Sequence, residues 1–277
     1  MTTTDATLRN DAEPNSPSLA EVLWTYAYAY TAAHDFAVSD RIMVDDYVLR
    51  MGFHALRGRN EQYQPATQRQ YRQYPTLGFT VHRLVTNGER AALHFTEHGR
   101  SMHGGGAAAW QGVSLYRWDG ERLTECRVEQ DYCSRRRQLD SGEPLPVASP
   151  GIDPWATEPM ASDESAVATV SEWLSSGSWL HDRAVSWDDG SGRARWAGPE
   201  TEVLDIFSAG TSVAFHAVVT GIYAGGVPGS DACLGADAEM FTTGIVDVSA
   251  DDSTDSGKVV AGQLVTDRHS MLARLNS

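Results

Sequence analysis

Hydrophobic and polar positions follow the same order in both halves of the chain. In the first half, apolar side chains recur at helical spacing over residues 18–36, where Ser18 and Glu21 have the spacing of a capping box. Strand-like runs follow at 43–51, 78–85, 90–103, 110–118 and 122–131. The polar, glutamine-rich stretch at 60–74 predicts a short helix. This order predicts an α+β fold in which a meander of long antiparallel strands follows a helix.

A proline-rich stretch separates the two halves. Residues 140–162 contain five prolines with glycine and serine between them, a composition typical of a linker. We therefore predict two domains, 18–139 and 163–277, joined by 140–162. Residues 1–17 are polar and are expected to form a disordered tail.

Shared residues at constant spacing indicate an internal duplication. A helix candidate at 164–174 opens the second half, and strands follow it. Where the first half has the long stretch 51–75, the second has only GSGRARWAGP. We therefore expect a reduced second copy whose pocket is open or filled by Phe215 and Tyr223, and one ligand per chain. The matched residues are Gly88 with Gly210, His94 with His216 and Gly104 with Gly226 at an offset of 122, and Asp131 with Asp267 at an offset of 136.

The uneven charge limits the classes of partner. The net charge is −15; residues 1–140 carry 16 Arg against 17 acidic residues, and residues 141–277 carry 6 basic against 20 acidic residues. An acidic half repels a phosphate backbone, so we expect no nucleic-acid partner, and we interpret the acidity as an aid to solubility. We expect no membrane partner and a cytoplasmic location, because no apolar run approaches the roughly 20 residues that cross a bilayer and the N-terminus lacks a secretory pattern. The three cysteines lack the paired spacing of a disulfide framework or a zinc site.

Three motifs resemble one superfamily. They are YAYTAAHDF at 28–36, Gly58-Arg59 after the first strand, and LYRWDGERLTECRVEQD at 115–131 followed by RRRQL. Together they resemble the nuclear transport factor 2-like superfamily, and in particular the SnoaL-like polyketide cyclases, over about 18–139 and more weakly over 163–275. The resemblance implies two tandem cone-shaped α+β barrels, each a curved antiparallel sheet wrapped round a helix with an apolar cavity at its open end. Members include cyclases, isomerases, dehydratases, epoxide hydrolases and domains without catalysis, so the fold does not define the function.

The catalytic positions of well-known relatives transfer poorly to this chain. The base of ketosteroid isomerases falls near Arg50 and Met51, and the Asp of scytalone dehydratases falls near Ala32. The limonene epoxide hydrolase triad falls on His98, Arg100 and Val128. None of these three chemistries is therefore supported. Asp131 does match the last-strand Asp that is common in the SnoaL-like group.

The strand at 90–103 carries the sharpest candidate chemistry. His94, His98 and Arg100 share one of its faces, because side chains alternate along a strand. If that face lines the cavity, imidazoles can transfer protons and a guanidinium can stabilise an oxyanion; if it faces solvent, these residues are incidental. We predict His98 and Asp131 as acid and base, Arg100 as the orienting group and Tyr28 as an assisting hydroxyl. The predicted substrate-binding residues are Trp24, Tyr30, His54, His94 and Trp110.

Two of these predictions have plain structural alternatives. The aromatic stripe of the first helix is more typical of a core than of a ligand site. The charged row Glu125, Arg127, Glu129 and Asp131 is typical of a solvated face or of packing against a partner sheet, either the other domain or another chain.

Two functions remain open at this point. The first is a cofactor-independent acid–base enzyme, of cyclase, isomerase or dehydratase type, that acts on an apolar small molecule, with no metal and no cofactor. The second is a non-catalytic small-molecule-binding or assembly module in which the two domains form a pseudo-dimer; a homodimer through the sheet faces also remains open. Convergence of His98, Arg100 and Asp131 on one enclosed cavity would favour the enzyme, and their dispersal over a surface would favour the module.

Overall fold

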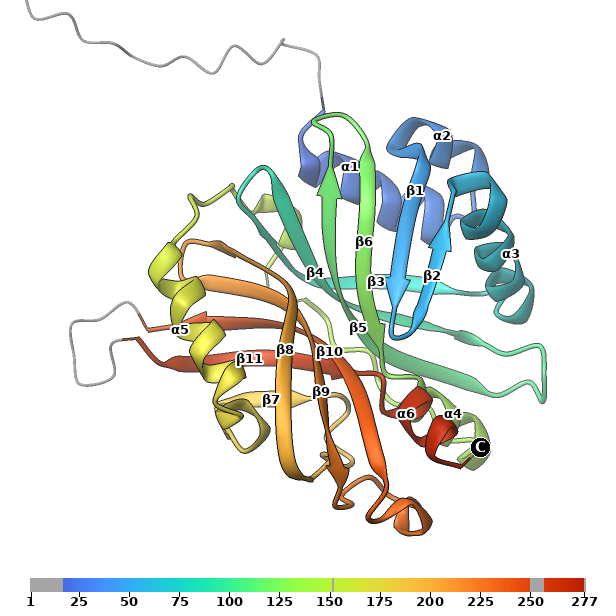
Figure 1. Cartoon of the computed structure of the whole chain (residues 1–277). Helices are drawn as coiled ribbons and strands as arrows, with labels where there is room; N and C mark the ends of the chain where they lie inside the picture. The colour runs from blue at the N-terminus through green and yellow to red at the C-terminus, as the bar shows by residue number, and fades with distance from the viewer. Residues whose placement is uncertain (1–16, 151, 250–256, 277) are drawn as a thin grey trace, which may run out of the picture.

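The structure, a computed structural model, describes residues 17–150, 152–249 and 257–276. The predicted tail falls almost wholly outside these residues. The first half forms a six-stranded sheet in the order β2-β1-β6-β5-β4-β3 (Figure 1). Its elements are α1 (Leu19–Thr25), η1 (Tyr26–Ala32), η2 (Phe36–Val38), α2 (Ser39–Ile42), β1 (Met43–Met51), β2 (His54–Arg57), η3 (Arg59–Tyr63), α3 (Gln64–Gln73), β3 (Gly78–Thr86), β4 (Arg90–Arg100), β5 (Ala107–Trp118), β6 (Leu123–Gln130) and α4 (Tyr132–Ser141).

The second half repeats this arrangement in reduced form. Its five-stranded sheet has the order β7-β11-β10-β9-β8, which is the first order without β2. No helix lies between β7 and β8 where the first half has η3 and α3. The internal duplication predicted from the sequence is thus present in the topology. The elements are η4 (Pro154–Ala156), α5 (Glu164–Ser175), η5 (Ser178–Leu180), β7 (Val185–Trp187), β8 (Trp196–Ala209), β9 (Ser212–Tyr223), η6 (Asp231–Cys233), β10 (Asp237–Val248), β11 (Val259–Thr266) and α6 (Arg268–Leu275).

Each sheet contains one parallel pair, which corrects the expectation of purely antiparallel sheets. β1 pairs with β6 in parallel, and β7 pairs with β11 in the same way. The first and last strands of each copy can be parallel because the whole meander separates them, which gives the chain length that a parallel connection requires. β2 and the closing helices α4 and α6 were also not predicted from the sequence. Asp131 and Asp267 are the residues immediately before these two helices.

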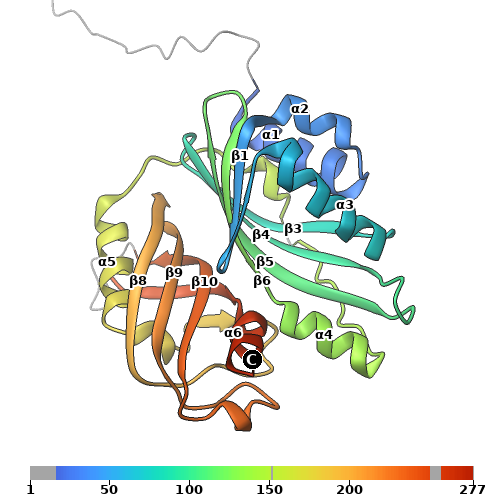
Figure 2. The same cartoon turned by 45° about the vertical axis from the view of Figure 1, so that its right-hand side comes forward.

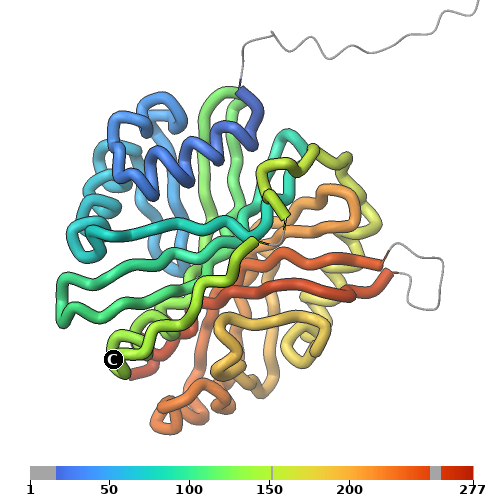
Figure 3. Tube along the Cα trace, turned by 180° about the vertical axis from the view of Figure 1, so that it is seen from behind, coloured from blue at the N-terminus to red at the C-terminus, as the bar shows by residue number. Residues whose placement is uncertain are grey.

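The two sheets pack against each other through their outer faces, and the helices cover the opposite faces (Figures 2 and 3). The contacts follow an approximate two-fold relation: β6 contacts β10 as β5 contacts β11, and α4 contacts its counterpart α6. An apolar cluster shared by both sheets fills the junction. The sheet face considered for a homodimer is therefore buried within one chain. The cluster contains Val85, Ala92, Val113, Leu115, Phe207, Ala209, Ala214, Ile245 and Val265.

Arginines of the first half meet carboxylates of the second across this junction. The Asp205 carboxylate, in a residue only 8% exposed, lies 2.6 Å from Arg90 and 2.8 Å from Arg117. Arg127 approaches the same carboxylate at 3.6 Å, and Arg83 pairs with Asp247 at 2.6 Å. Part of the acidity of the second half thus serves the contact between the two sheets.

Limited proteolysis is expected to cut first within 142–150. That part of the predicted linker is almost entirely exposed, whereas the part after it is tied down. The Met160 amide donates to the Thr86 carbonyl, and the Gly210 amide donates to the Ala161 carbonyl. Brief digestion with a low-specificity protease, followed by mass spectrometry of the fragments, measures the site. First cleavage within 90–131 would contradict the predicted domain boundary.

Candidate active site

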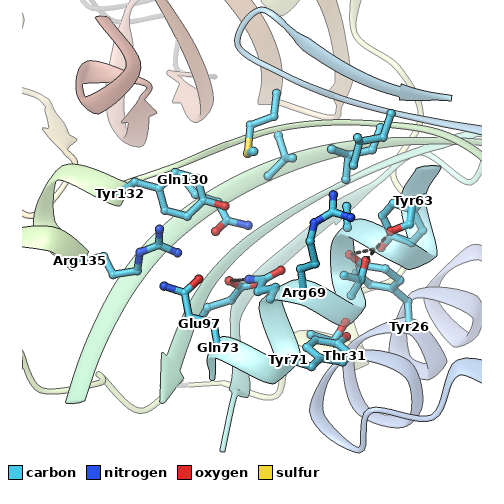
Figure 4. Close-up of a pocket in the computed structure, with 17 residues that line it drawn as sticks. Tyr26, Thr31, Tyr63, Arg69, Tyr71, Gln73, Glu97, Gln130, Tyr132 and Arg135 are labelled. Carbon is cyan, nitrogen blue, oxygen red and sulfur yellow. Dashed lines mark hydrogen bonds between the residues drawn. The ribbon is translucent and has the colours of Figure 1, made fainter. Parts of the chain in front are cut away.

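A cavity of about 340 Å³ lies between the inner face of the first sheet and the helices that cover it (Figure 4). Tyrosines from η1, η3 and α3 surround one end of it, and Glu97, Gln130, Tyr132 and Arg135 gather at the other. Its size is in the range of small-molecule sites. The lining residues are Tyr26, Thr31, Leu49, Met51, Leu56, Tyr63, Ala66, Thr67, Arg69, Gln70, Tyr71, Gln73, Glu97, Val128, Gln130, Tyr132 and Arg135.

Two π-helical stretches build the tyrosine end. The first helix starts with the predicted capping box, in which the Ser18 hydroxyl accepts from the Glu21 amide. It then widens into a π-helix at Tyr26–Ala32, and Arg59–Tyr63 forms a second one. The Tyr63 hydroxyl donates to the Tyr26 hydroxyl across 3.3 Å, and burial raises the pKa of both phenols. π-Helical turns occur frequently at functional sites.

Helix α3 covers the middle of the cavity and supplies most of its amides. The sequence analysis predicted a helix here. Ala66, Gln70 and Gln73 share one helical face toward the cavity because they are three or four residues apart. The Gln70 side-chain amide donates to the Glu97 carboxyl at 2.8 Å.

Glu97 is the buried acid of this cavity. It lies on β4, is 5% exposed, and projects inward on the same face as Leu93 and Phe95. Burial raises its pKa to about 7, although the nearby Arg135 and the hydrogen bond from Gln70 oppose this rise. A carboxyl group with this pKa can both give and take a proton near neutral pH, which is the property that acid–base catalysis requires.

The groups around Glu97 are mostly hydrogen-bond donors. The Trp110 indole donates to the Gln130 carbonyl oxygen at 2.8 Å, and the Gln130 amide group faces the Glu97 side of the cavity, where it helps to lower the pKa of Glu97. The Arg135 guanidinium carbon lies 4.1 Å from the centroid of the Tyr132 ring and 5.1 Å from that of Trp110. Stacking on these rings holds the guanidinium at the polar end of the cavity without a carboxylate partner.

The structure places the predicted histidine face of β4 on the side away from the cavity. His98 contacts the Thr80 hydroxyl at 3.2 Å, and its ring covers Gly78. His94 bonds to the Gln111 side chain at 2.9 Å, and burial lowers its pKa to about 4. Arg100 is exposed and donates to the Gly105 carbonyl in the adjacent turn. His94, His98 and Arg100 therefore lie on the opposite face of β4 from Glu97, which does line the cavity.

Asp131 lies at the junction of the two halves rather than at the cavity mouth. It is 1% exposed, its carboxylate accepts from the Ser134 amide, and Arg268 pairs with it at 2.8 Å. Its neighbours on the charged row also face the second half: Arg127 approaches Asp205, and Glu129 lies 3.1 Å from His216. The row therefore packs against the other sheet of the same chain, as one of the two structural alternatives predicted.

The predicted aromatic and rim residues have other surroundings. The Tyr28 hydroxyl accepts from the Trp155 indole at 3.1 Å, outside the cavity. Tyr30 is fully buried in the tyrosine cluster behind the wall, Trp24 is 49% exposed and His54 is exposed. Two of the nine predicted site residues support cavity groups directly: Trp110 through its bond to Gln130, and Tyr30 by stacking on Tyr26 and Tyr63.

Glu97, Gln70 and Arg135 were not among the site residues predicted from the sequence. One signal for Glu97 was available: it interrupts the otherwise apolar row Ala91, Leu93 and Phe95 on one face of its strand. An acid that ends an apolar row is a candidate for a buried functional carboxyl. Gln70 and Arg135 carried no such signal, because their positions depend on how α3 and α4 fold back over the sheet.

The interior of the second half is filled by side chains. Phe215 is fully buried and its ring meets Trp173 edge-on at 6.2 Å. Tyr223 is also fully buried, and its hydroxyl contacts the Ser230 hydroxyl at 2.5 Å. At the offset of 122 the counterpart of Glu97 is the apolar Val219. The second copy therefore lacks the acid that marks the first.

Within the described residues, no group of three or more His, Cys, Asp or Glu side chains is arranged to hold a metal ion. No helix in the described part of the chain is long and apolar enough to cross a membrane.

Comparison with known families agrees with the topology. Residues 24–126 match the SnoaL-like domain family. This part of the chain is a SnoaL-like domain. The matched region ends before α4, so it includes Glu97 and the helices over the cavity but not Arg135. No curated protein sequence matches the chain.

Several solved structures are similar to about half of the chain. A protein of Jannaschia sp. CCS1 that is assigned as a SnoaL-like polyketide cyclase is 15% identical over 48% of this chain and 99% of its own length, with a TM-score of 0.43. A protein of Shewanella denitrificans OS-217 with the same assignment is 20% identical over 44% of this chain and 96% of its own length, with a TM-score of 0.40. TsrD from Streptomyces laurentii is 22% identical over 43% of this chain and 92% of its own length, with a TM-score of 0.39.

The buried Glu97 carboxyl is expected to make stability depend on pH. Its pKa rises from 4.5 to about 7 on folding, so the folded state holds the proton more tightly and its stability falls as pH rises through this range. Glu97→Gln removes this dependence. Between pH 5 and pH 8 the wild type should lose roughly 2–3 kcal/mol relative to the variant. Chemical denaturation of both proteins at the two pH values measures the difference, and parallel pH curves would contradict the raised pKa.

Proposed function

We propose that the SnoaL-like domain is an acid–base catalyst that needs no cofactor and acts on an apolar carbonyl compound, in a cyclisation, isomerisation or dehydration step. The observation that carries this proposal is the Glu97 carboxyl, buried in a cavity of about 340 Å³ with a pKa raised to about 7. The cavity combines this one acid with apolar walls and several hydrogen-bond donors, as small-molecule sites commonly do. The same proposal assigns one site per chain, a cytoplasmic location, and no nucleic-acid or membrane partner.

The proton steps follow from the arrangement of the side chains. The Glu97 carboxylate takes a proton from the carbon next to a substrate carbonyl; the electron pair of that C–H bond forms a C=C bond, and the π pair of the carbonyl moves to its oxygen, which gives an enolate. The Gln130 amide group is the donor placed to stabilise this oxyanion. Return of the proton to another carbon isomerises the substrate. Attack of the enolate carbon on a second carbonyl closes a ring, and Glu97 then gives its proton to the new alkoxide.

Gln70 positions the acid. Its amide donates to one oxygen of Glu97 at 2.8 Å, which leaves the other oxygen for the substrate. The tyrosine end of the cavity holds the carbon skeleton through apolar and ring contacts.

Hydrogen exchange into a model ketone tests the proposal without knowledge of the natural substrate. The wild-type protein is incubated with 1-tetralone in deuterated buffer, and deuterium at the carbon next to the carbonyl is followed by mass spectrometry. We expect exchange above the buffer rate. If the protein accelerates exchange neither into 1-tetralone nor into any of a panel of larger polycyclic ketones, acid–base chemistry at this site is contradicted.

A non-catalytic binding module is the second candidate, and one observation favours it. His98, Arg100 and Asp131 do not converge on the cavity; they are dispersed over the outer face of β4 and the junction. If the cavity held no acid such as Glu97, this dispersal would favour the binding module over the enzyme. Tight binding of a ketone that undergoes no exchange would be the result that supports it.

A further inference from the structure

Two guanidinium groups at the cavity make no hydrogen bond or ion pair with the described residues. Within the described part of the chain, neither Arg69 nor Arg135 forms a hydrogen bond or an ion pair through its side chain. Other arginines of the same half do: Arg50 pairs with Glu125 at 2.9 Å, and Arg59 pairs with Asp45 at 2.7 Å. Donors left free at the wall of a cavity are available to a ligand.

The two groups face the cavity from opposite sides. Arg135 enters from α4, which follows the inner strand β6, and Arg69 extends from α3 over the middle of the cavity (Figure 4). Arg135 is half-buried and held by stacking on three rings, with its guanidinium carbon 5.5 Å from the centroid of the third, Tyr74. A planar fork held in place in this way is suited to a carboxylate, which accepts two parallel hydrogen bonds from one guanidinium.

Among the described residues that line the cavity, one carboxyl group is present, and it cannot neutralise both guanidiniums. Glu97 already accepts from Gln70, and burial favours its neutral form, so at neutral pH it offers at most part of one negative charge. The polar end of the cavity therefore has an excess of positive charge, while the opposite end is lined by tyrosines and aliphatic side chains such as Leu56 and Val128.

We propose that the ligand is an amphipathic carboxylic acid: its carboxylate binds Arg135, with Arg69 as a second donor, and its apolar skeleton occupies the tyrosine end. This inference rests on the proposed function in naming the substrate class of the same cavity. It makes the acid group an anchor rather than a reacting group, because Glu97 lies between the anchor and the skeleton. A substrate held at both ends presents its central carbons to Glu97.

A matched pair of probes tests the anchor. Binding of 2-naphthoate and of 2-naphthamide, which share a skeleton and differ in charge, is measured by calorimetry on the full chain. We expect 2-naphthoate to bind about 10- to 100-fold more tightly, the range for hydrogen bonds to a charged group. Equal affinities in the wild type would overturn the proposal.

Variants assign the effect to Arg135. In Arg135→Gln the preference for 2-naphthoate should disappear while 2-naphthamide affinity stays the same, which shows that the cavity is intact; Arg135→Lys should keep part of the preference. Arg72→Gln is the control, because Arg72 is an exposed arginine of α3 outside the cavity lining. A preference that survives in Arg135→Gln would overturn the assignment. If Arg135→Gln does not fold, the wild-type pair and Arg135→Lys decide.

The same measurements separate this inference from the proposed function. Glu97→Gln should keep the preference for 2-naphthoate, because the anchor does not include Glu97. A preference for 2-naphthoate in a protein that catalyses no hydrogen exchange into ketones would support the carboxylic-acid ligand and contradict catalysis. Exchange without preference would contradict the acid ligand and leave catalysis standing.

Discussion

Replacement of Glu97 by Gln is expected to lower the rate of ketone hydrogen exchange by about 10²- to 10⁴-fold, the contribution typical of a catalytic acid or base. Gln keeps the shape of the side chain and can still accept the hydrogen bond from Gln70, so the cavity should persist. It cannot take a proton. In the wild type the exchange rate should rise with pH through about 7 and then level off, because the carboxylate is the active form.

The neighbouring residue of the same strand provides the control. His98 lies one position along β4 on the opposite face, where it contacts Thr80 outside the cavity. His98→Gln should therefore change the exchange rate by less than about threefold, whereas loss of an acid or base costs far more. Full activity in Glu97→Gln together with inactivity in His98→Gln would reverse the assignment and restore the prediction made from the sequence.

Replacement of Arg268 by Met is expected to lower the free energy of unfolding by about 3–5 kcal/mol, because it leaves buried carboxylates without their partner. Arg268 is 1% exposed at the junction and lies 2.8 Å from Asp131, 2.7 Å from Asp189 and 3.5 Å from Asp188. It also donates to the Gly192 carbonyl at 2.8 Å. Without the guanidinium, the neighbouring carboxyl groups repel one another across the two halves.

Chemical denaturation measures this loss, and two variants define its origin. Arg136→Met is the surface control, because Arg136 is exposed and pairs with Asp140 within its own helix at 3.8 Å; its effect should stay below about 1 kcal/mol. Adding Asp131→Asn to Arg268→Met should restore part of the loss by removing one unpaired charge. A loss of less than about 1 kcal/mol in Arg268→Met would show that water or neighbouring groups replace the guanidinium.

Much of the fold could be predicted because its signals are local. The capping box at Ser18 and Glu21 formed as expected, and the strand predicted at 43–51 has those bounds. The matched pair Asp131 and Asp267 marks the same structural position in both halves, the residue before the closing helix. Asp131 caps its helix by accepting from the Ser134 amide, whereas the Asp267 carboxylate accepts from the Phe241 amide. The duplication is therefore revealed by the shared position in the chain rather than by a shared contact.

Helix α4 shows why some elements escaped prediction. Its sequence YCSRRRQLDS has three consecutive arginines and only a weak apolar stripe. Its three arginines make unlike contacts: Arg135 stacks on Tyr74 and Trp110 at the cavity, Arg137 pairs with Asp189 of the second half, and Arg136 pairs with Asp140 within the helix. Three of these partners are distant in sequence, so the pattern along the helix could not indicate them.

The sequence by itself determined that β4 has two distinct faces, one with Ala91, Leu93 and Phe95 and one with Ala92 and His94. Only the tertiary structure decided which face meets the cavity. Both faces are covered, the first by the helices and the second in part by the other sheet, so neither shows the polarity of a solvent-exposed side. Alternation along a strand is a local property of the backbone, whereas the choice of face depends on which elements pack against it. That choice placed Glu97 in the cavity and His98 outside it.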